Sequence, residues 1–332
     1  MDSPALALDK RIRSLRPPKA RVDAYVAHGS VLEEERRPGG RIEQALTVFL
    51  TGAECPFTCS FCDLWQWTLD GPTPPGALTR QLERVLEGAG GDARDGAARD
   101  GVTRDRRPPD RLKLYNASNF FDQRAVPSED MLGIAKLAAP FAAITVESHA
   151  STITPRTLEF SRQISGRLEV AMGLETIHPA AAAQLNKRLD LARFDSAARF
   201  LSGNGIDLRV FVLLGAPYVP VDETVEWTIR TVEYAIERGA SVVSIIPVRG
   251  GNGELERLQG LGRFTPPTLS QLEESLDLSL KFTSAVVTAD LWDVDRLPAC
   301  EPCRTERVER LQRANLSGRV QSRVSCGACG AE

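Results

Sequence analysis

The chain has 332 residues, of which 42% are hydrophobic and 26% are charged, and its formal net charge is -3. The length excludes a short peptide. The composition excludes a disordered protein, because a chain with this hydrophobic content can bury a substantial core. At about 150 residues per domain, the length predicts roughly two domains or one barrel-sized domain with additions. The longest nearly apolar stretch, residues 133–146, is too short for a bilayer, and residues 1–16 do not resemble a signal peptide. We therefore expect a cytoplasmic protein with no membrane partner.

Seven cysteines are present, and a cytosolic compartment keeps thiols reduced, so the sequence predicts metal ligands rather than disulfides. They form two groups, and none is left over. The pI near 5.8 argues against wholesale, non-specific binding of nucleic acid, although a local basic patch is compatible with it. The groups are Cys55, Cys59 and Cys62, and the two CxxC pairs Cys300, Cys303, Cys326 and Cys329.

Six short runs rich in β-forming residues are apolar on both faces or nearly so, which is typical of a parallel sheet covered by helices. These runs span residues 46–51, 111–115, 143–147, 168–174, 206–214 and 241–248. Helix signals fall between them, including a cap at Ser128, a start at Thr154 and Pro155, a cap at Asp195 and a capping box at Thr268 and Gln271. The alternation predicts a doubly wound sheet or a complete or partial β/α barrel.

Residues 89–110 are rich in Gly, Asp and Arg and have no apolar periodicity, so we interpret them as a mobile insertion. An arginine-rich arm for nucleic acid is the alternative, but the aspartates nearly cancel the arginines. The expected organisation is an N-terminal extension over residues 1–44, a barrel over 45–290 and a cysteine-rich module over 291–332.

The first predicted strand runs directly into Cys55, Cys59 and Cys62, at the strand end where a β/α fold places its active site. Three thiolates at this C-x3-C-x2-C spacing can hold three irons of a [4Fe-4S] cluster and leave the fourth iron free to chelate a small molecule. A structural zinc or three buried cysteines are the alternatives. Structural zinc needs four ligands, however, and no nearby His or Cys supplies the fourth.

The stretch from Cys55 to Cys62, with Phe61 before the last cysteine, resembles the signature of the radical SAM superfamily. The resemblance implies a partial (β/α)6 TIM-like barrel, a [4Fe-4S] cluster whose open iron binds S-adenosylmethionine (SAM), and a reductant such as flavodoxin or ferredoxin. It also implies reductive cleavage of SAM to methionine and a 5′-deoxyadenosyl radical that abstracts hydrogen. The phrases LKLYNASNFFD, TVESHAS, AMGLET and LNKR look most like the branch with archaeosine-forming lyases, elongator-type subunits and methylthiotransferases.

The resemblance extends over roughly residues 45–250 and implies SAM contacts at the ends of the later strands. The implied contacts are Asn116, Ala117 and Ser118 at the amino group, Glu147 and Glu175 at the ribose or amino end, Lys187 or Arg188 at the carboxylate, and the turn of Leu213, Leu214, Gly215, Ala216 and Pro217 with Pro247 and Val248 beside the adenine. Each has a structural alternative, such as a helix cap, a turn or a solvated charge. His149 and His178 are weaker candidates for substrate contact, and Trp65 and Trp67 either wall the cluster pocket or belong to the core.

The four C-terminal cysteines have the two-knuckle form of a zinc ribbon, and four thiolates also suit an auxiliary [4Fe-4S] cluster. The spacer between the pairs carries Arg307, Arg310 and Arg313 at intervals of three, which predicts a helix with a basic face. This face is either solvated or an RNA-contacting element.

The sequence thus predicts a radical SAM enzyme whose reaction subclass and oligomeric state stay open. The acidic pI and the absence of an RNA-binding domain favour a small-molecule substrate, and the branch resemblance and the basic spacer favour a nucleoside in tRNA. A non-catalytic iron-sulfur or zinc protein that binds nucleic acid is the alternative of another class.

Overall fold

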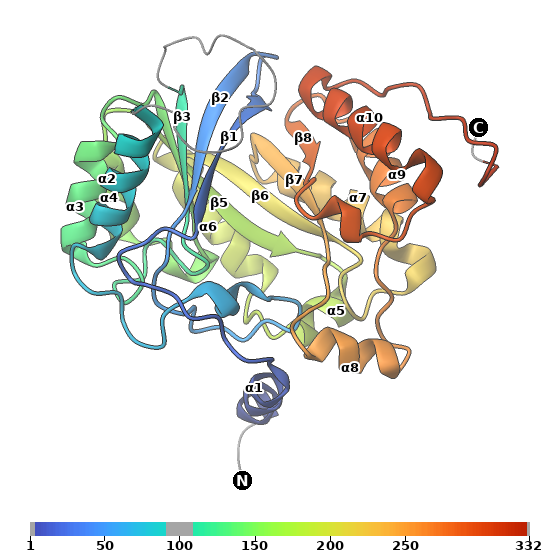
Figure 1. Cartoon of the computed structure of the whole chain (residues 1–332), viewed down its shortest axis with the longest axis horizontal. Coiled ribbons are helices and arrows are strands. Elements are labelled where there is room, and N and C mark those ends of the chain that lie inside the picture. The colour runs from blue at the N-terminus through green and yellow to red at the C-terminus, as the bar shows by residue number, and fades with distance from the viewer. Residues whose placement is uncertain (1–3, 91–108, 331–332) are drawn as a thin grey trace.

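The computed structural model describes residues 4–90 and 109–330, and within them the backbone forms one eight-stranded sheet (Figure 1). The strands follow one another in chain order across the sheet, and the sheet curls into a half-barrel. Strands β2 to β8 are parallel, whereas β1 pairs antiparallel with β2 at one edge. The strands are β1 (Gly29–Arg36), β2 (Ile42–Phe49), β3 (Arg111–Tyr115), β4 (Ala143–Glu147), β5 (Arg167–Glu175), β6 (Asp207–Leu214), β7 (Val242–Pro247) and β8 (Val286–Ala289).

The predicted partial barrel is confirmed, and β2 to β7 correspond to the six predicted runs. Two strands were missed by the sequence analysis. Strand β1, GSVLEEER, is rich in glutamate, which is depleted in strands, and β8 has only four residues. The predicted insertion falls largely on residues 91–108, which lie outside the described part of the chain.

Helices cover the outer face of the sheet, and α1 projects from the end at which the parallel strands finish (Figure 1). They are α1 (Pro4–Leu15), α2 (Ala77–Gly90), α3 (Ser128–Leu137), α4 (Pro155–Gln163), α5 (Pro179–Gln184), α6 (Leu191–Gly203), α7 (Thr224–Glu237), α8 (Glu254–Gly260), α9 (Leu269–Ser279) and α10 (Arg304–Ser317), with 3-10 turns η1 (Leu64–Trp67), η2 (Ala150–Thr152), η3 (Val221–Glu223), η4 (Val294–Arg296) and η5 (Glu301–Cys303). None of the described helices is long and apolar enough to cross a membrane.

Two of the predicted helix starts are correct and two are wrong. Helix α4 starts after Thr154 with Pro155 as its first residue, and a capping box forms at Thr268 with Gln271, as the sequence predicts. Helix α6 begins earlier than predicted, because Asp190 rather than Asp195 accepts a hydrogen bond from a backbone N–H of its first turn. Ser128 is the first residue of α3 and makes no capping hydrogen bond.

The inner face of the sheet is not apolar, which corrects the expectation that the strands are apolar on both faces. Glu169 of β5 is fully buried and accepts hydrogen bonds from Arg37, which follows β1, and from Arg209 of β6. Burial alone would raise the pKa of Glu169, but Arg209, Arg37 and Arg111 lower it to about 2. Lys113 of β3 pairs in turn with glutamates of β1. This ion network explains why a glutamate-rich segment forms the edge strand.

The arginines of α10 do not form the predicted basic face. Arg307 and Arg310 are 7% and 1% exposed, and they pair with Glu273 and Asp277 of α9. Arg313 is exposed and lies 3.7 Å from Glu309. Arg307 and Arg310 therefore face carboxylates of the neighbouring helix α9, and their charges are not presented to solvent.

Candidate active site and metal centre

Cys55, Cys59 and Cys62 lie on the loop that leaves β2, at the end of the half-barrel where the parallel strands finish. Asn119, beyond the end of β3, donates a hydrogen bond from Nδ2 to Sγ of Cys55 at 3.4 Å. Burial raises the pKa of all three thiols, that of Cys59 to about 12, whereas the nearby Lys187 ammonium lowers it at Cys55 and Cys59. A positive metal centre would supply the compensation that these buried thiolates need.

Among the described residues, Cys55, Cys59 and Cys62 do not form a group that could hold a single metal ion. Among the described residues, the group of metal-ligating side chains whose donor atoms all lie within 4.8 Å of one another is the C-terminal one, and this loop is not part of it. Thiolates that hold different irons of one cluster stand farther apart than thiolates on one ion. The donor set of three thiolates therefore fits a [4Fe-4S] cluster with one iron open, and it does not fit a mononuclear zinc site.

A loop of backbone N–H groups faces Glu147 at the end of β4. The carboxylate accepts a hydrogen bond from the backbone N–H of Asn116 at 2.8 Å, and the N–H groups of Ala117 and Ser118 also contribute. Burial raises the pKa of Glu147 to about 7, although these N–H groups and the ammonium of Lys187 oppose the shift. Ala117 has a positive φ of 52°, which turns the loop toward the carboxylate.

Unpartnered polar atoms mark this loop as a place for a polar ligand. Both side-chain polar atoms of Asn116 and the hydroxyl of Ser118 are buried and have no hydrogen-bond partner within the part of the chain that the structure describes. Buried polar groups normally find a partner, so such groups beside three cysteines call for an explanation. SAM, with an amino and a carboxylate group, fits a site that offers these donors and acceptors.

Glu175 and Lys187 form a buried pair next to the cysteine loop, with Nζ 2.6 Å from Oε1. A Cβ on Gly173 would lie 2.0 Å from that oxygen and 2.7 Å from the nitrogen, so only glycine leaves room for the pair. Arg188 is 46% exposed at its side chain and pairs with Asp9 of α1 instead. Of the two predicted basic residues, Lys187 is therefore the one that faces the site.

Three residues that the sequence analysis missed fasten the cysteine loop. Nδ2 of Asn186 donates to the backbone oxygen of Thr58 at 2.8 Å, and the carboxylate of Asp9 accepts from the hydroxyl of Thr58. On the other side, Asn252 donates to the backbone oxygen of Ser60 at 2.8 Å. Asn186 stands in the LNKR phrase and Asn252 in a glycine-rich turn after β7, which are the signals that could have found them.

The remaining predicted residues divide between the site and the core. Phe61 is half-buried and packs beside a small cluster that includes Leu213 and Val248. Leu214 is fully buried in the main core, whereas Leu213, in the same predicted turn, belongs to the cluster beside Phe61.

The histidines and tryptophans make structural contacts. His149 packs on Phe57 with ring centroids 4.2 Å apart, and burial lowers its pKa to about 3. His178 accepts a hydrogen bond at the start of α5. Trp65 is buried beneath the guanidinium of Arg16 at 4.5 Å. Four more aromatic and turn residues, Trp67, Gly215, Pro217 and Pro247, line strand ends or their loops.

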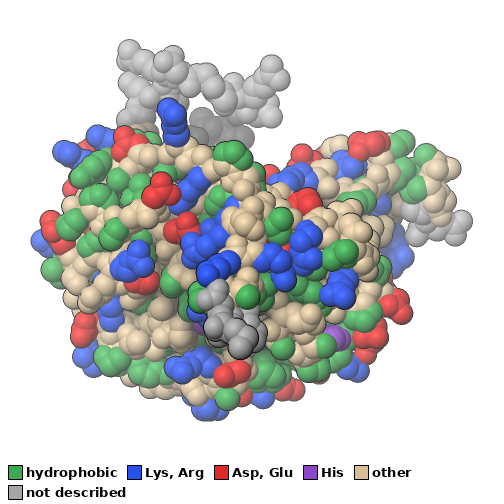
Figure 2. Space-filling view, turned by 90° about the horizontal axis from the view of Figure 1, so that it is seen from below, with side chains coloured by type: hydrophobic (Ala, Val, Ile, Leu, Met, Phe, Trp, Pro, Cys, Tyr) green, Lys and Arg blue, Asp and Glu red, His purple; other side chains and the backbone are tan. Residues whose placement is uncertain are grey.

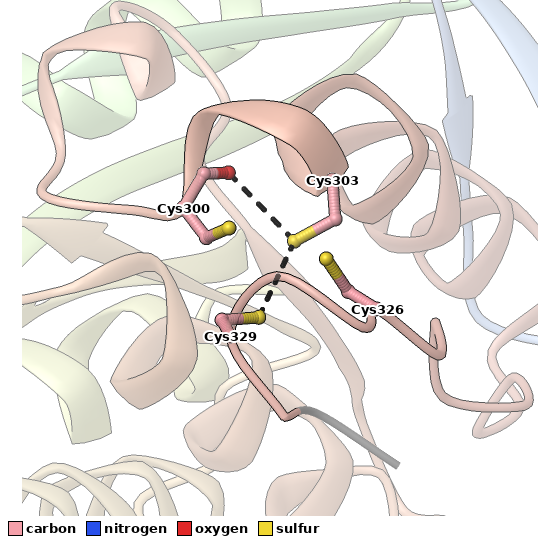
Figure 3. Close-up of side chains that lie close together, drawn as sticks. All are labelled: Cys300, Cys303, Cys326 and Cys329. Atoms are coloured by element: carbon pink, nitrogen blue, oxygen red, sulfur yellow. Dashed lines mark hydrogen bonds between the residues drawn. The ribbon is translucent and has the colours of Figure 1, made fainter.

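The four C-terminal cysteines converge at one point, as Figure 3 shows. Cys300 and Cys303 lie at the start of α10, and Cys326 and Cys329 lie on the loop after it. All four sulfurs lie within 4.8 Å of one another, and those of Cys303 and Cys329 are 3.9 Å apart. Hydrogen bonds from the backbone of Cys329 and Ala328 lower the pKa of Cys326 to about 7. This group is a metal-binding site in its chemistry and its geometry.

Comparison with known proteins identifies the fold. No protein-family model matches the chain, and no curated protein matches its sequence. The structure of Elp3 from the archaeon Methanocaldococcus infernus, with an N-terminal deletion, matches 77% of this chain at 12% identity and a TM-score of 0.50. Methylornithine synthase (PylB) matches 96% of this chain and 78% of its own at 15% identity and a TM-score of 0.52. The chain spans 62% of the length of the Elp3 structure.

A radical SAM methyltransferase from Sphaerobacter thermophilus is 15% identical over 83% of this chain and 76% of its own, with a TM-score of 0.48. The chain has the half-barrel fold of the radical SAM enzymes. At these identities the likeness concerns the fold, and the chemistry has to be argued from the residues.

Proposed function

We propose that the protein is a radical SAM enzyme that cleaves SAM reductively and abstracts hydrogen from a small-molecule substrate. The observation that carries this proposal is the position of Cys55, Cys59 and Cys62 on the loop after the first parallel strand, beside the Glu147 loop. A nucleoside in tRNA is the alternative substrate. Arg307 and Arg310 are buried, so α10 lacks the basic face that favoured a tRNA substrate.

In this proposal the three thiolates hold three irons, and SAM occupies the fourth. When bound, the cluster and SAM supply a 5′-deoxyadenosyl radical. Glu147 holds the N–H groups of the loop at Asn116, and the unpartnered side-chain oxygen of Asn116 would accept a hydrogen bond from the amino group of SAM. Lys187 lies where its ammonium can meet the carboxylate. Phe61 packs along the adenine and excludes water from it.

We also propose that Cys300, Cys303, Cys326 and Cys329 bind one zinc ion rather than an auxiliary cluster. Four thiolates around tetrahedral zinc at about 2.3 Å stand about 3.8 Å from one another. The 3.9 Å between the sulfurs of Cys303 and Cys329 agrees with that spacing.

The test compares Cys59→Ala with Cys329→Ala in protein reconstituted anaerobically with iron and sulfide. We expect Cys59→Ala to lose the bleachable iron-sulfur absorption and all formation of 5′-deoxyadenosine from SAM and dithionite. Cys329→Ala, which touches only the second site, should keep both. Normal 5′-deoxyadenosine formation by Cys59→Ala would overturn the proposal, and its absence in the wild type would favour the non-catalytic alternative.

A further inference from the structure

The charge of the chain is distributed unevenly, and its N-terminal segment is strongly basic. Residues 4–22 contain six basic residues and a single acidic one, Asp9, although the whole chain carries a net charge of -3. Figure 2 shows Lys and Arg side chains gathered on the face from which α1 projects. An acidic protein that concentrates positive charge on one face presents a directed field to whatever approaches that face.

Three of the bases on this face, Arg11, Arg13 and Arg188, are more exposed than the carboxylates with which they pair. Glu254, Asp9 and Glu54 have side chains 0%, 16% and 20% exposed. Their partners Arg11, Arg188 and Arg13 are 46%, 46% and 51% exposed. Lys10 is exposed as well. The surface that solvent meets is therefore positive, and we call Lys10, Arg11, Arg13 and Arg188 the basic face.

The helix that carries most of the basic face, α1, is in direct contact with the cysteine loop. Asp9 of α1 accepts a hydrogen bond from Thr58, which stands between Cys55 and Cys59. Arg16, which follows α1, pairs at 2.8 Å with Glu54, the residue before Cys55. Helix α1 and the residue after it therefore touch the loop that carries the three cysteines at two points.

We propose that the basic face is the docking surface for a small acidic electron-donor protein. This inference rests on the proposed function, because a cluster that cleaves SAM must first be reduced. One electron leaves the donor, which is oxidised, and enters the cluster, which is reduced, and no bond forms or breaks in that step. Charge complementarity favours an acidic partner, and electron-transfer encounters of this kind are weak, with interfaces below about 1,200 Å².

The test reverses two charges on α1, Lys10→Glu with Arg13→Glu, and uses a bacterial flavodoxin as the probe. The carboxylate of Glu54 keeps Arg16 and Lys19 after this change, so the fold should hold. If the charge-reversal variant does not fold, Lys10→Gln with Arg13→Gln is used in its place. The matched control reverses Arg162 and Arg199, which are exposed on α4 and α6.

Calorimetric titration at low and high salt should show flavodoxin binding that weakens at least tenfold in the α1 variant and loses its salt dependence. Formation of 5′-deoxyadenosine should fall with reduced flavodoxin and stay unchanged with dithionite, which needs no docking. The control should match the wild type in both measurements.

Equal flavodoxin binding by the wild type and the α1 variant would overturn the inference. So would loss of tRNA retention in a gel shift with flavodoxin binding unchanged, because the face would then serve nucleic acid. A wild type that forms no 5′-deoxyadenosine with dithionite contradicts the proposed function instead, and the calorimetric result still decides the docking surface.

Discussion

The two cysteine groups of this protein use the same ligand atom in opposite ways. The group at Cys55 places three half-buried cysteines on one loop, and the loop after the neighbouring strand β3 holds unpartnered polar atoms of Asn116 and Ser118. The group at Cys300 brings four thiols to a single point, and its last member, Cys329, is exposed. An incomplete and open set leaves a coordination position for chemistry, whereas a closed set of four does not. Spacing and closure, more than residue type, therefore distinguish the two groups, and the proposed roles follow from that difference.

Removing a ligand from the closed site should have the largest effect on stability. We expect Cys303→Ala, at a buried position, to abolish zinc binding and to lower the melting temperature by about 5 °C or more, because metal binding there contributes to folding. Metal analysis of the wild type should give about four irons and one zinc, and that of the variant about four irons and no zinc. About eight irons in the wild type would assign the second site to an auxiliary cluster.

Arg310 holds the loop that leads to Cys326 and Cys329, so its replacement tests how the closed site is stabilised. Its guanidinium pairs with Asp277 at 2.7 Å and donates to the backbone oxygens of Gln321 and Ser322, four residues before Cys326. Arg310→Met should cost about 3 kcal/mol in the free energy of unfolding, since it leaves a buried carboxylate without its partner. Arg313→Met, on the same helix but exposed, should change it by less than about 0.5 kcal/mol. Equal effects in urea unfolding would show that α10 does not pack as described.

Local patterns predicted much of this architecture. The strands β2 to β7 follow from short β-rich runs, and both cysteine groups follow from spacing alone. Hydrophobic patterning fails where burial is achieved by ion pairs: Glu169, Arg209 and the glutamates of β1 look like surface residues in the sequence and lie inside the half-barrel. The same failure made Arg307 and Arg310 look like a solvated or RNA-binding face.

The fastening of the cysteine loop could not be predicted for a different reason. Asp9 and Asn186 are 177 residues apart and meet through a 2.8 Å hydrogen bond, and no local pattern reports a contact over such a separation. Three thiols in sequence indicate a cluster, but the residues that hold their loop become visible only when the chain is folded.

The pH dependence of the free energy of unfolding tests the burial of the Glu147 carboxylate. Burial raises its pKa from the usual value of 4.5 to about 7, so the folded protein binds a proton that the unfolded chain has already released between these values. Stability should therefore fall as the pH rises from about 5 to 7, by at most about 3 kcal/mol. In Glu147→Gln this part of the pH dependence should disappear, as urea unfolding at several pH values would reveal. A variant with the wild-type pH profile would contradict the assignment to Glu147.

Replacing Asp9 should have the smallest effect, because Asp9 contacts the cysteine loop through Thr58 and Asn186 and not through a cysteine. Its carboxylate accepts hydrogen bonds from Thr58 and Asn186 and pairs with Arg188, and these three groups lower its pKa against the effect of burial. Asp9→Asn keeps the shape but removes the charge, so the fold should lose about 1 kcal/mol or less.

The cysteine loop should nevertheless open more often in Asp9→Asn, since Thr58 stands between Cys55 and Cys59, two of the proposed cluster ligands. We expect the iron-sulfur absorption to bleach about threefold faster in the presence of a chelator, while the zinc at the closed site leaves at the wild-type rate. Asp23→Asn, at an exposed turn outside the cysteine loop, is the matched control and should bleach like the wild type. Should both metals leave faster in Asp9→Asn, the change would be a general loss of stability, and the distinction between an open site fastened by α1 and an independent closed site would fail.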